Sequence, residues 1–385
     1  MTVPNRGRVV LLGMLTRHPV PGMVWLTAQY LEGFRRLGYD VYYVEPHAGG
    51  RSATSRQDAE WIDRVMKTFG LADRWAIDEK HGDGECYGMS RAALRGLYRD
   101  ADVILNLNGG SKALPELCET GRLVYLGTDP MEVEVSLYEG NQTTVDYLRR
   151  HAEIFSWGEC YGTDTCLVPP TDEFNFLPTR QPVIIDHWHP HRGEHAASST
   201  FTTVGNWRQA YREFEFRGEM FAWSKHLEFE RVMDLPRRCD ARFELALASC
   251  TEDDCARLES FGWGVRPASS LTDPFDYRNY VTASRGEFTV AKEQYARLRS
   301  GWFSDRSACY LASGRPVVTS ETGFSDVLPS GEGLFGFDTV EEAADAIEAI
   351  EADYVRHCAA AIEIARSFFS YDVVLPALLD RLEFA

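Results

Sequence analysis

Residues 301–329 read GWFSDRSACYLASGRPVVTSETGFSDVLP, and this stretch contains a polar turn, a short helix, a strand and a second polar loop. The apolar helix is predicted over residues 308–312, and Gly314 ends it because glycine enters the left-handed region without strain. Residues 315–318 are predicted as a buried strand, and residues 320–325 as the loop at its carboxyl end. This order is typical of one unit of an open α/β sheet, in which ligands bind beyond the carboxyl ends of the strands.

The N-terminal half shows the same alternation of strands and helices. Residues 8–13 (RVVLLG) form a continuous apolar run that ends at glycine, as expected of a parallel strand covered on both faces. A helix is predicted over residues 23–37, where apolar residues recur at helical spacing, and Gly38 ends it. Further elements of the doubly wound pattern are predicted at residues 40–44, 57–69, 101–106, 123–126, 145–151 and 154–157.

The Pro-rich stretch 168–182 (VPPTDEFNFLPTRQP) is typical of an extended linker between domains. A second series of alternating elements follows it, beginning with a strand predicted at residues 182–186. The sequence therefore predicts two α/β domains of similar size with a cleft between them. Further strands of the second half are predicted at 200–204, 243–248 and 286–290, and helices at 222–233, 253–261, 276–284, 340–351 and 352–382.

The charge and the cysteines restrict the class of protein. The 385 residues carry 40 basic and 58 acidic side chains, which give a formal net charge of −18. Phosphate backbones attract Lys and Arg, so this charge argues against a general nucleic-acid or membrane-surface partner. The N-terminus lacks the apolar segment of a signal peptide, and no stretch has the ~20 apolar residues that span a bilayer. The nine cysteines are scattered with no CxxC pair, which favours free thiols in a cytoplasmic protein.

Motifs of several common enzyme classes are absent. After the first predicted strand, Gly13 and Gly22 are too far apart for a GxGxxG dinucleotide fingerprint, and the sequence has no GxxxxGKS/T phosphate loop and no GxSxG nucleophile elbow. The cluster HWHPHxxxH, which holds His187, His189, His191 and His195, matches no structural zinc pattern. We expect exposed or hydrogen-bonded histidines there, and no bound metal or cofactor. His187 follows a predicted strand end, so a place in the cleft is the other reading for it.

Several cationic side chains in the second half lie close to predicted turns between strands and helices. In an acidic chain, such cations at one edge of a sheet indicate a site for a small anion, which backbone N–H groups at a helix N-terminus also favour. A solvated surface charge is the alternative for each of them taken singly. The cations are Lys225, Arg285, Lys292, Arg299 and Arg306, and the neighbouring hydroxyls and turn are Ser304, Ser307, Thr322 and Gly323.

Residues 300–336 resemble the C-terminal half of nucleotide-sugar glycosyltransferases with two Rossmann-like domains facing across a cleft, the GT-B fold. In those enzymes a helix ending A-x-G-x-P-V-V precedes a loop with a Gly pair and an acidic residue. The similar segment here is ASGRPVV at 312–318, followed by TGFSD at 322–326, and FRRLGYDVYYVEP at 34–46 resembles the family's first helix and second strand. The resemblance implies an N-terminal acceptor domain (1–175), a nucleotide-sugar domain (176–365) and a C-terminal helix (366–385) that packs on the first domain.

The chain departs from the family at two positions. Retaining members carry two Glu residues eight apart before the Gly of that motif, one near the donor sugar and one at the ribose. Aligned on Gly314, these positions hold Gly301 and Cys309, and neither is acidic. Asp305 lies one helical turn before Cys309 and is the residue that we expect to substitute.

The resemblance implies metal-independent transfer of a sugar from a nucleoside-diphosphate donor to a small-molecule acceptor. Cations and backbone N–H groups then stabilise the negative charge that develops on the leaving diphosphate. Lys225 resembles the family's phosphate-binding Lys in position. The other donor-site residues that we predict are Gly22, Asn206, Lys292, Ser304, Asp305, Arg306, Ser307, Thr322 and Gly323.

The reaction outcome is left open by the sequence. An inverting enzyme needs a general base, for which His18 and Asp129 in the first half are the candidates, whereas a retaining enzyme of this fold needs none. Asp129 before Pro130 also fits a plain turn. Two other functions remain open: a sugar-nucleotide epimerase or pseudo-glycosyltransferase with the same fold, and a non-catalytic protein that binds sugar nucleotides.

Overall fold

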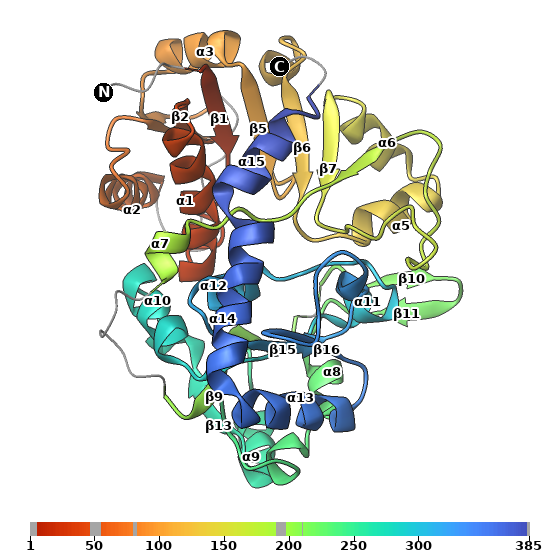
Figure 1. The fold of residues 1–385 in the computed structure, drawn as a ribbon. Coiled ribbons are helices and arrows are strands. Elements are labelled where there is room, and N and C mark those ends of the chain that lie inside the picture. Colours follow the sequence, from red (N-terminus) through yellow and green to blue (C-terminus); the bar gives the residue numbers. More distant parts are fainter. Residues whose placement is uncertain (1–5, 47–54, 80–82, 190–197, 210, 383–385) are drawn as a thin grey trace.

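The computed structural model describes residues 6–46, 55–79, 83–189, 198–209 and 211–382, which form two main sheets with helices packed around them (Figure 1). The first sheet has the strand order β4-β3-β2-β1-β5-β6-β7-β8. Neighbouring strands run parallel, except that β4 pairs antiparallel with β3. Its strands are β1 (Arg8–Leu12), β2 (Asp40–Glu45), β3 (Trp75–Asp78), β4 (Cys86–Gly88), β5 (Val103–Leu107), β6 (Leu123–Gly127), β7 (Glu153–Ser156) and β8 (Phe176–Pro178).

The second sheet is wholly parallel and has the order β13-β12-β9-β14-β15-β16. Counted within this sheet the order is 3-2-1-4-5-6, the doubly wound arrangement, and its direction reverses between β9 and β14. Two parallel sheets of this kind confirm the predicted fold class. The strands are β9 (Thr200–Asn206), β12 (Arg242–Ala248), β13 (Gly264–Pro267), β14 (Gly286–Phe288), β15 (Val317–Ser320) and β16 (Leu334–Phe337).

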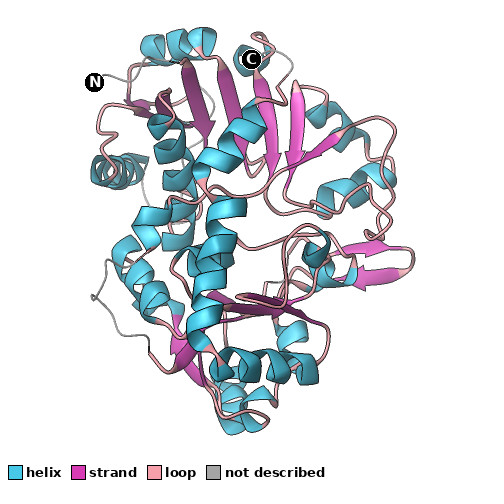
Figure 2. Cartoon of the chain, viewed as in Figure 1, coloured by secondary structure: helices cyan, strands magenta, loops and turns pink. Residues whose placement is uncertain are grey.

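The helices lie on both sides of the sheets (Figure 2). α1 begins at Pro21, where a missing N–H costs nothing, and the chain leaves it through Gly38 at φ 95°. The first half also holds α2 (Ser55–Thr68), α3 (Arg91–Asp100), α4 (Pro115–Cys118), α5 (Glu132–Tyr138), α6 (Gln142–Leu148) and α7 (Ile185–Trp188), with α1 spanning Pro21–Arg36. The second holds α8 (His226–Arg231), α9 (Glu252–Phe261), α10 (Pro274–Ala283), α11 (Glu293–Arg297), α12 (Asp305–Ala312), α13 (Val340–Ala352), α14 (Tyr354–Ile364) and the short turns Leu235–Arg237, Ala268–Ser270 and Phe324–Asp326.

The end of the chain returns to the first sheet. After α14 come a π-helical turn (Ala365–Phe369) and α15 (Tyr371–Leu379), which contacts α1 (Figure 1). Gly33 of α1 permits this approach, because a Cβ there would lie 2.6 Å from Leu375 Cδ1. Leu375 and Leu378 join the core cluster that α1 forms with one face of the first sheet.

Two elements between the sheets differ from the sequence prediction. The stretch 168–182, predicted as a linker, contains β8, which pairs with β7 at the edge of the first sheet. The strand predicted at 182–186 is wrong, because Val183 forms a single bridge to Ser370 and the chain then enters α7. The physical reason is that these apolar residues pack on helices: Val183 shares a core cluster with Trp25 of α1 and Leu311 of α12.

The helix predicted at 222–233 is also wrong over residues 222–225 and 232–233, since only His226–Arg231 is helical. Residues 222–225 connect a hairpin, formed by β10 (Phe214–Phe216) and β11 (Glu219–Phe221), to α8. They are held in place by tertiary contacts. Trp223 packs edge-on against Tyr295 at 5.7 Å between centroids, and Ser224 Oγ donates to the Trp207 carbonyl at 3.1 Å. These contacts override the local helical pattern.

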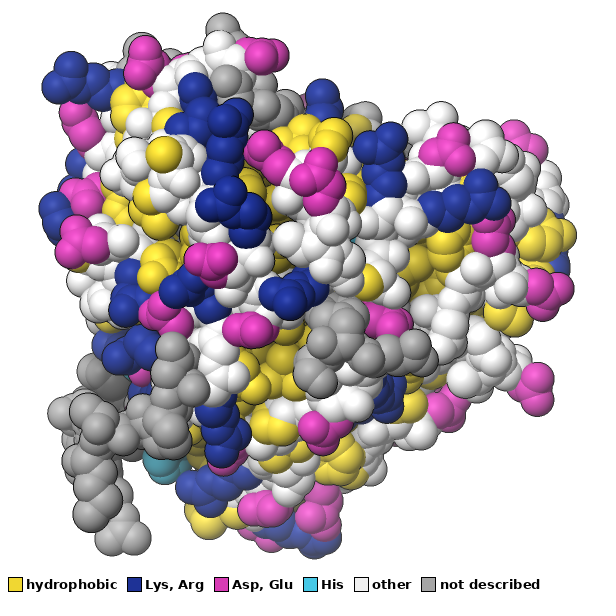
Figure 3. All heavy atoms as spheres, turned by 90° about the horizontal axis from the view of Figure 1, so that it is seen from above, with side chains coloured by type: hydrophobic (Ala, Val, Ile, Leu, Met, Phe, Trp, Pro, Cys, Tyr) yellow, Lys and Arg dark blue, Asp and Glu magenta, His cyan; other side chains and the backbone are white. Residues whose placement is uncertain are grey.

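The surface carries both signs of charge. Figure 3, which views the molecule from above, shows Lys and Arg interspersed with Asp and Glu over that face. Within the described ranges, no helix combines the length and the apolar character needed to cross a membrane.

Candidate functional site

The carboxyl ends of β9 and β14 meet where the strand order of the second sheet reverses, which is the usual ligand position in such sheets. Lys225, just before α8, reaches this point: Nζ donates to Thr289 Oγ1 at 3.2 Å and to the Val290 carbonyl at 2.6 Å. Lys225 is 7% exposed and, within the described part of the chain, makes no ion pair closer than 4.0 Å. Burial lowers the pKa of this ammonium well below its usual value, so a bound anion would stabilise its charged form.

Arg306 of α12 also reaches the switch point, but its guanidinium is engaged there. Nε donates to Glu287 Oε1, NH1 to the Val204 carbonyl at 2.7 Å, and NH2 to Thr289 Oγ1 at 3.1 Å. All three nitrogens are therefore bound to β9, β14 or the residue after β14. Arg306 gives the site positive charge and fixes its strands, and the structure shows no nitrogen of it without a protein partner.

Asp129, which follows β6 in the first sheet, binds residues of the second half. Its Oδ1 lies 3.1 Å from Lys292 Nζ and accepts from the Tyr295 hydroxyl, and Arg212 NH1 is 3.8 Å from Oδ2. Burial alone would raise the pKa of the Asp129 carboxyl, but Lys292 and Arg212 outweigh it and hold the pKa below its usual value. Burial lowers the pKa of Lys292 to about 8, against the opposing charge of Asp129. Two predicted site residues thus meet as an ion pair between the halves.

The start of α12 brings further predicted residues to this region. Asp305 is half-buried, and burial raises the pKa of its carboxyl against the opposing charge of Arg306. Ser304 occupies the cap position without a side-chain capping bond.

Ser307, one turn into α12, is fully buried and its Oγ has no partner within the described residues. The predicted hydroxyl pair Ser304 and Ser307 therefore differs in setting. Ser304 lies at the helix start, whereas Ser307 faces the packed interior, where few ligands reach.

The two positions that hold Glu in retaining glycosyltransferases are both packed against the first half. Gly301 has φ 75°, and a Cβ there would lie 2.6 Å from both the backbone N and Sγ of Cys160. Cys309 is buried, and its Sγ accepts from Gln29 Nε2 of α1 at 3.7 Å. Both positions thus serve the packing of the second half against the first, in place of the Glu pair.

Thr322 and Gly323 hold the turn after β15 in place. Thr322 Oγ1 donates to the Trp302 carbonyl at 2.7 Å, and the Gly323 N–H donates to Glu321 Oε1 at 2.6 Å. The Gly323 carbonyl accepts from Cys160 Sγ at 3.3 Å, which joins this turn to the first half. Their polar groups are therefore occupied by structural contacts.

The remaining predicted residues lie on the outer parts of the site. Asn206 is exposed at the end of β9, and His18 is exposed in the loop after β1. Gly22 is the second residue of α1, and a Cβ there would be 3.9 Å from the Tyr277 hydroxyl of α10. The structure joins Lys292 to Asp129 as an ion pair, and it places Lys225 beside the residues that follow β14 and Asp305 at the start of α12.

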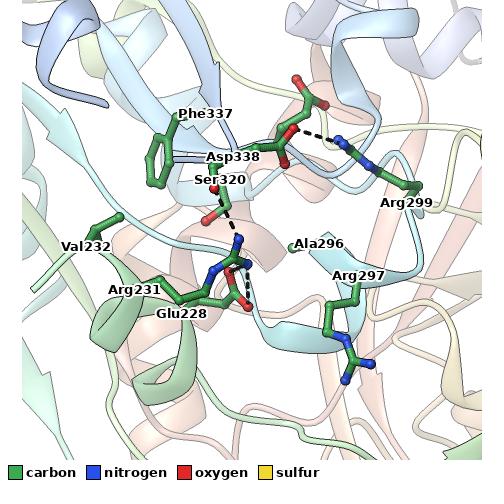
Figure 4. Close-up of a pocket in the computed structure, with 10 residues that line it drawn as sticks. Glu228, Arg231, Val232, Ala296, Arg297, Arg299, Ser320, Phe337 and Asp338 are labelled. Atoms are coloured by element: carbon green, nitrogen blue, oxygen red, sulfur yellow. Dashed lines mark hydrogen bonds and ion pairs between the residues drawn. The ribbon is translucent and has the colours of Figure 1, made fainter. Parts of the chain in front are cut away.

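Two of the predicted cations lie elsewhere. Arg285 precedes β14 at its amino end and pairs with Glu351 at 2.6 Å, so it lies at the opposite edge of the sheet. Arg299 lines a pocket of about 180 Å³ at the carboxyl ends of β15 and β16, where it pairs with Asp338 at 2.9 Å (Figure 4). None of the predicted donor-site residues lines this pocket.

The histidine cluster is only partly described. The His187 ring packs 5.7 Å from Trp25, and His189 ends α7, whereas His191 and His195 lie outside the described residues. In the ranges that the structure describes, no three His, Cys, Asp or Glu side chains are grouped as a metal site would require.

Three residues of the site were missed by sequence reasoning: Tyr295, Trp223 and Arg212. The Trp223 ring lies 3.1 Å from Lys292 Nζ and 4.1 Å from the Arg212 guanidinium carbon, so two cations share one aromatic ring. Trp223 lies two residues before Lys225 in the sequence, and this closeness to a predicted site residue is the signal that could have identified it. Arg212, at φ 62°, belongs to a loop with no recognisable motif.

No protein-family model and no curated protein matches the sequence. Solved structures do match over the whole chain. One is HepE from Anabaena in complex with UDP (14% identity, TM-score 0.59, covering 98% of this chain and 100% of that one). Others are AviGT4, a glycosyltransferase involved in avilamycin A biosynthesis (13%, TM-score 0.52, covering 98% and 97%), and an α-glucosyltransferase with UDP and a 13-mer DNA (11%, TM-score 0.56, covering 98% and 99%).

These likenesses extend over both sheets and the helix that returns to the first. They agree with the strand orders and with the resemblance of residues 300–336. The chain has the GT-B fold of nucleotide-sugar glycosyltransferases, with its two Rossmann-like sheets.

Proposed function

We propose that the protein transfers a sugar from a nucleoside-diphosphate sugar to a small-molecule acceptor, with the diphosphate bound at the β9–β14 switch point. One observation carries this proposal: the Lys225 ammonium is buried there, and its hydrogen bonds within the described part of the chain go to two neutral oxygens. A buried cation without a counter-ion is costly, and a diphosphate would supply one. The solved structures with UDP share the fold on which this site is built.

The chemistry follows from the charges. When the bond between the anomeric carbon and the phosphate oxygen breaks, negative charge develops on the leaving diphosphate. Lys225, with Lys292 and the N–H groups at the start of α12, would stabilise that charge, and we propose that no divalent ion is needed. The acceptor oxygen bonds to the anomeric carbon, and its proton passes to Asp129 in an inverting enzyme or to the leaving phosphate oxygen in a retaining one.

We further propose that residues 1–175 hold the acceptor and residues 176–365 the donor, with residues 366–385 belonging to the acceptor side, and that the enzyme is cytoplasmic. Asp305 would bind the donor in place of the absent Glu pair, because it is the carboxylate at the start of α12, next to Arg306 of the switch point. His18 stays a second candidate base, exposed in the loop after β1.

The test is a binding titration of UDP, GDP, ADP and dTDP by calorimetry, with Lys225→Met and Lys67→Met. Lys67 is an exposed lysine of α2 that pairs with Asp63. Loss of a charge-assisted hydrogen bond is worth about 1.5–3 kcal/mol, so Lys225→Met should weaken binding by about 10- to 100-fold, while Lys67→Met leaves it unchanged. A wild-type protein that binds none of the nucleotides refutes the proposal.

Turnover separates the three functions. Release of free nucleoside diphosphate on adding an acceptor supports transfer, and its persistence in EDTA supports metal independence. A donor isomerised without acceptor supports an epimerase, whereas tight binding with no reaction supports a binding protein.

A further inference from the structure

The two lysines at the switch point differ in their counter-ions. Among the described residues Lys225 has no ion-pair partner within 4.0 Å, whereas Lys292 is bound by Asp129, a carboxylate that comes from the loop after β6 in the other sheet. The Asp129 carboxylate therefore belongs to the half of the molecule that is proposed to hold the acceptor. Asp129 is about a third exposed and Lys292 less so, so the pair lies at the edge of solvent, where a ligand can reach it.

We propose that Asp129 is an internal stand-in for the donor phosphate: it neutralises Lys292 while the site is empty, and the diphosphate displaces it when the donor binds. The inference rests on the proposed function and adds how that site is regulated. A diphosphate carries more negative charge than one carboxylate, so it competes well for an ammonium. No covalent bond changes in this exchange.

The surroundings of the pair permit the exchange. Lys292 is held over the Trp223 ring, 3.1 Å from its centroid, and this contact does not depend on Asp129. Asp129, once released, keeps Arg212, whose NH1 is 3.8 Å away and whose Nε binds Glu132. Neither charge is therefore left buried and uncompensated, which is the usual obstacle to breaking such a pair.

Two consequences follow for the order of events. Part of the free energy of donor binding is used to break the Lys292–Asp129 ion pair. The observed donor affinity is therefore lower than it would be if Lys292 were already free of Asp129. The released carboxylate then faces the acceptor half only after the donor is bound. Donor binding should therefore precede any step in which Asp129 takes a proton.

The test is a double-mutant cycle of UDP and pyrophosphate binding by calorimetry. Asp129→Asn keeps an acceptor for the Tyr295 hydroxyl and removes the competing charge. UDP should bind to it about 5- to 20-fold more tightly than to wild type, and this gain should vanish in Asp129→Asn/Lys292→Met compared with Lys292→Met. Asp186→Asn, which removes the ion pair with Arg36 away from the site, should leave the affinity unchanged.

An unchanged or weaker affinity of Asp129→Asn overturns the inference, as does an equal gain in the Lys292→Met background, which would show a general charge effect. Crystals of wild-type protein with UDP give a readout that needs no variant. Lys292 Nζ must then contact a phosphate oxygen and lie more than 4.0 Å from Asp129; a complex with the pair intact also overturns the inference. If wild type binds UDP through Lys225 while Asp129→Asn has no effect, the proposed function stands and only the exchange fails.

Discussion

Arg306 Nε donates to Oε1 of Glu287, a carboxylate of β14 with no exposed surface. Removing one partner of a buried ion pair leaves the other charge uncompensated. Arg306→Met should therefore lower the free energy of unfolding by about 3–5 kcal/mol, measured by urea denaturation. The double variant Glu287→Gln/Arg306→Met should lose less, because both charges are then absent.

The matched control for this prediction is Arg238→Met, which breaks the exposed pair with Glu341 and should cost far less stability than Arg306→Met. Equal losses in the two single variants would contradict a structural role for Arg306.

Gly301→Ala tests whether the missing Glu is a matter of packing. Gly301 and Gly331 both have positive φ, 75° and 102°, but only Gly301 has a neighbour, Cys160, within 4 Å of a built Cβ. Both substitutions strain the backbone, and Gly301→Ala should cost about 1–3 kcal/mol more because it also overpacks the contact with the first half. Thermal unfolding of the two variants measures the difference, and equal melting temperatures would rule out the packing account.

Asp305→Asn should separate stability from binding. Burial raises the pKa of this carboxyl in the folded protein, so the folded state holds its proton more tightly than the unfolded state does. Stability therefore falls as pH rises from the ordinary carboxyl pKa, about 4, through the raised value, and the Asn variant escapes this loss. Asp305→Asn should melt higher than wild type at pH 7.5, with the gain shrinking toward pH 4, and should bind UDP more weakly. If Asp305→Asn melts lower than wild type at pH 7.5 and becomes relatively more stable on acidification, the pKa of Asp305 is lowered in the folded protein and the prediction is wrong.

Donor binding should take up protons at Lys225. Burial lowers the pKa of its ammonium, and a bound diphosphate would raise it again. UDP titrations in two buffers of different ionisation enthalpy should show net uptake that grows with pH, after subtraction of the values for Lys225→Met. Identical uptake in wild type and Lys225→Met would place the proton elsewhere.

Much of the fold could be read from single segments. The strand predicted at 315–318 is β15 (Val317–Ser320), and the helix predicted at 308–312 begins at Asp305, one turn earlier. These elements are buried, so their apolar runs carry the signal. β3 and β4 were missed because polar residues and glycines surround these short segments and obscure their pattern. The hairpin β10–β11 was missed because its turn, Arg217 and Gly218, was not recognised.

The site was predictable only in part. Lys225 follows a strand end, so its neighbourhood could be inferred from local order. Lys292 and Asp129 are 163 residues apart in sequence, and neither local sequence predicts the other residue as its partner. The same holds for Arg306: the sequence shows that this residue is a cation, but it does not show that the buried Glu287 pairs with it.

The contact between α1 and α15 has a consequence for synthesis. On the ribosome α1 emerges long before α15, so the face of α1 that packs against α15 stays uncovered until the second half has been synthesised. The nascent first sheet must wait with an apolar helix face open to solvent, a state that favours chaperone binding. A fragment cut after residue 175 would keep every strand of that sheet but β8 and would lack the helix that covers α1, so we expect it to be less stable than the same half in the whole chain.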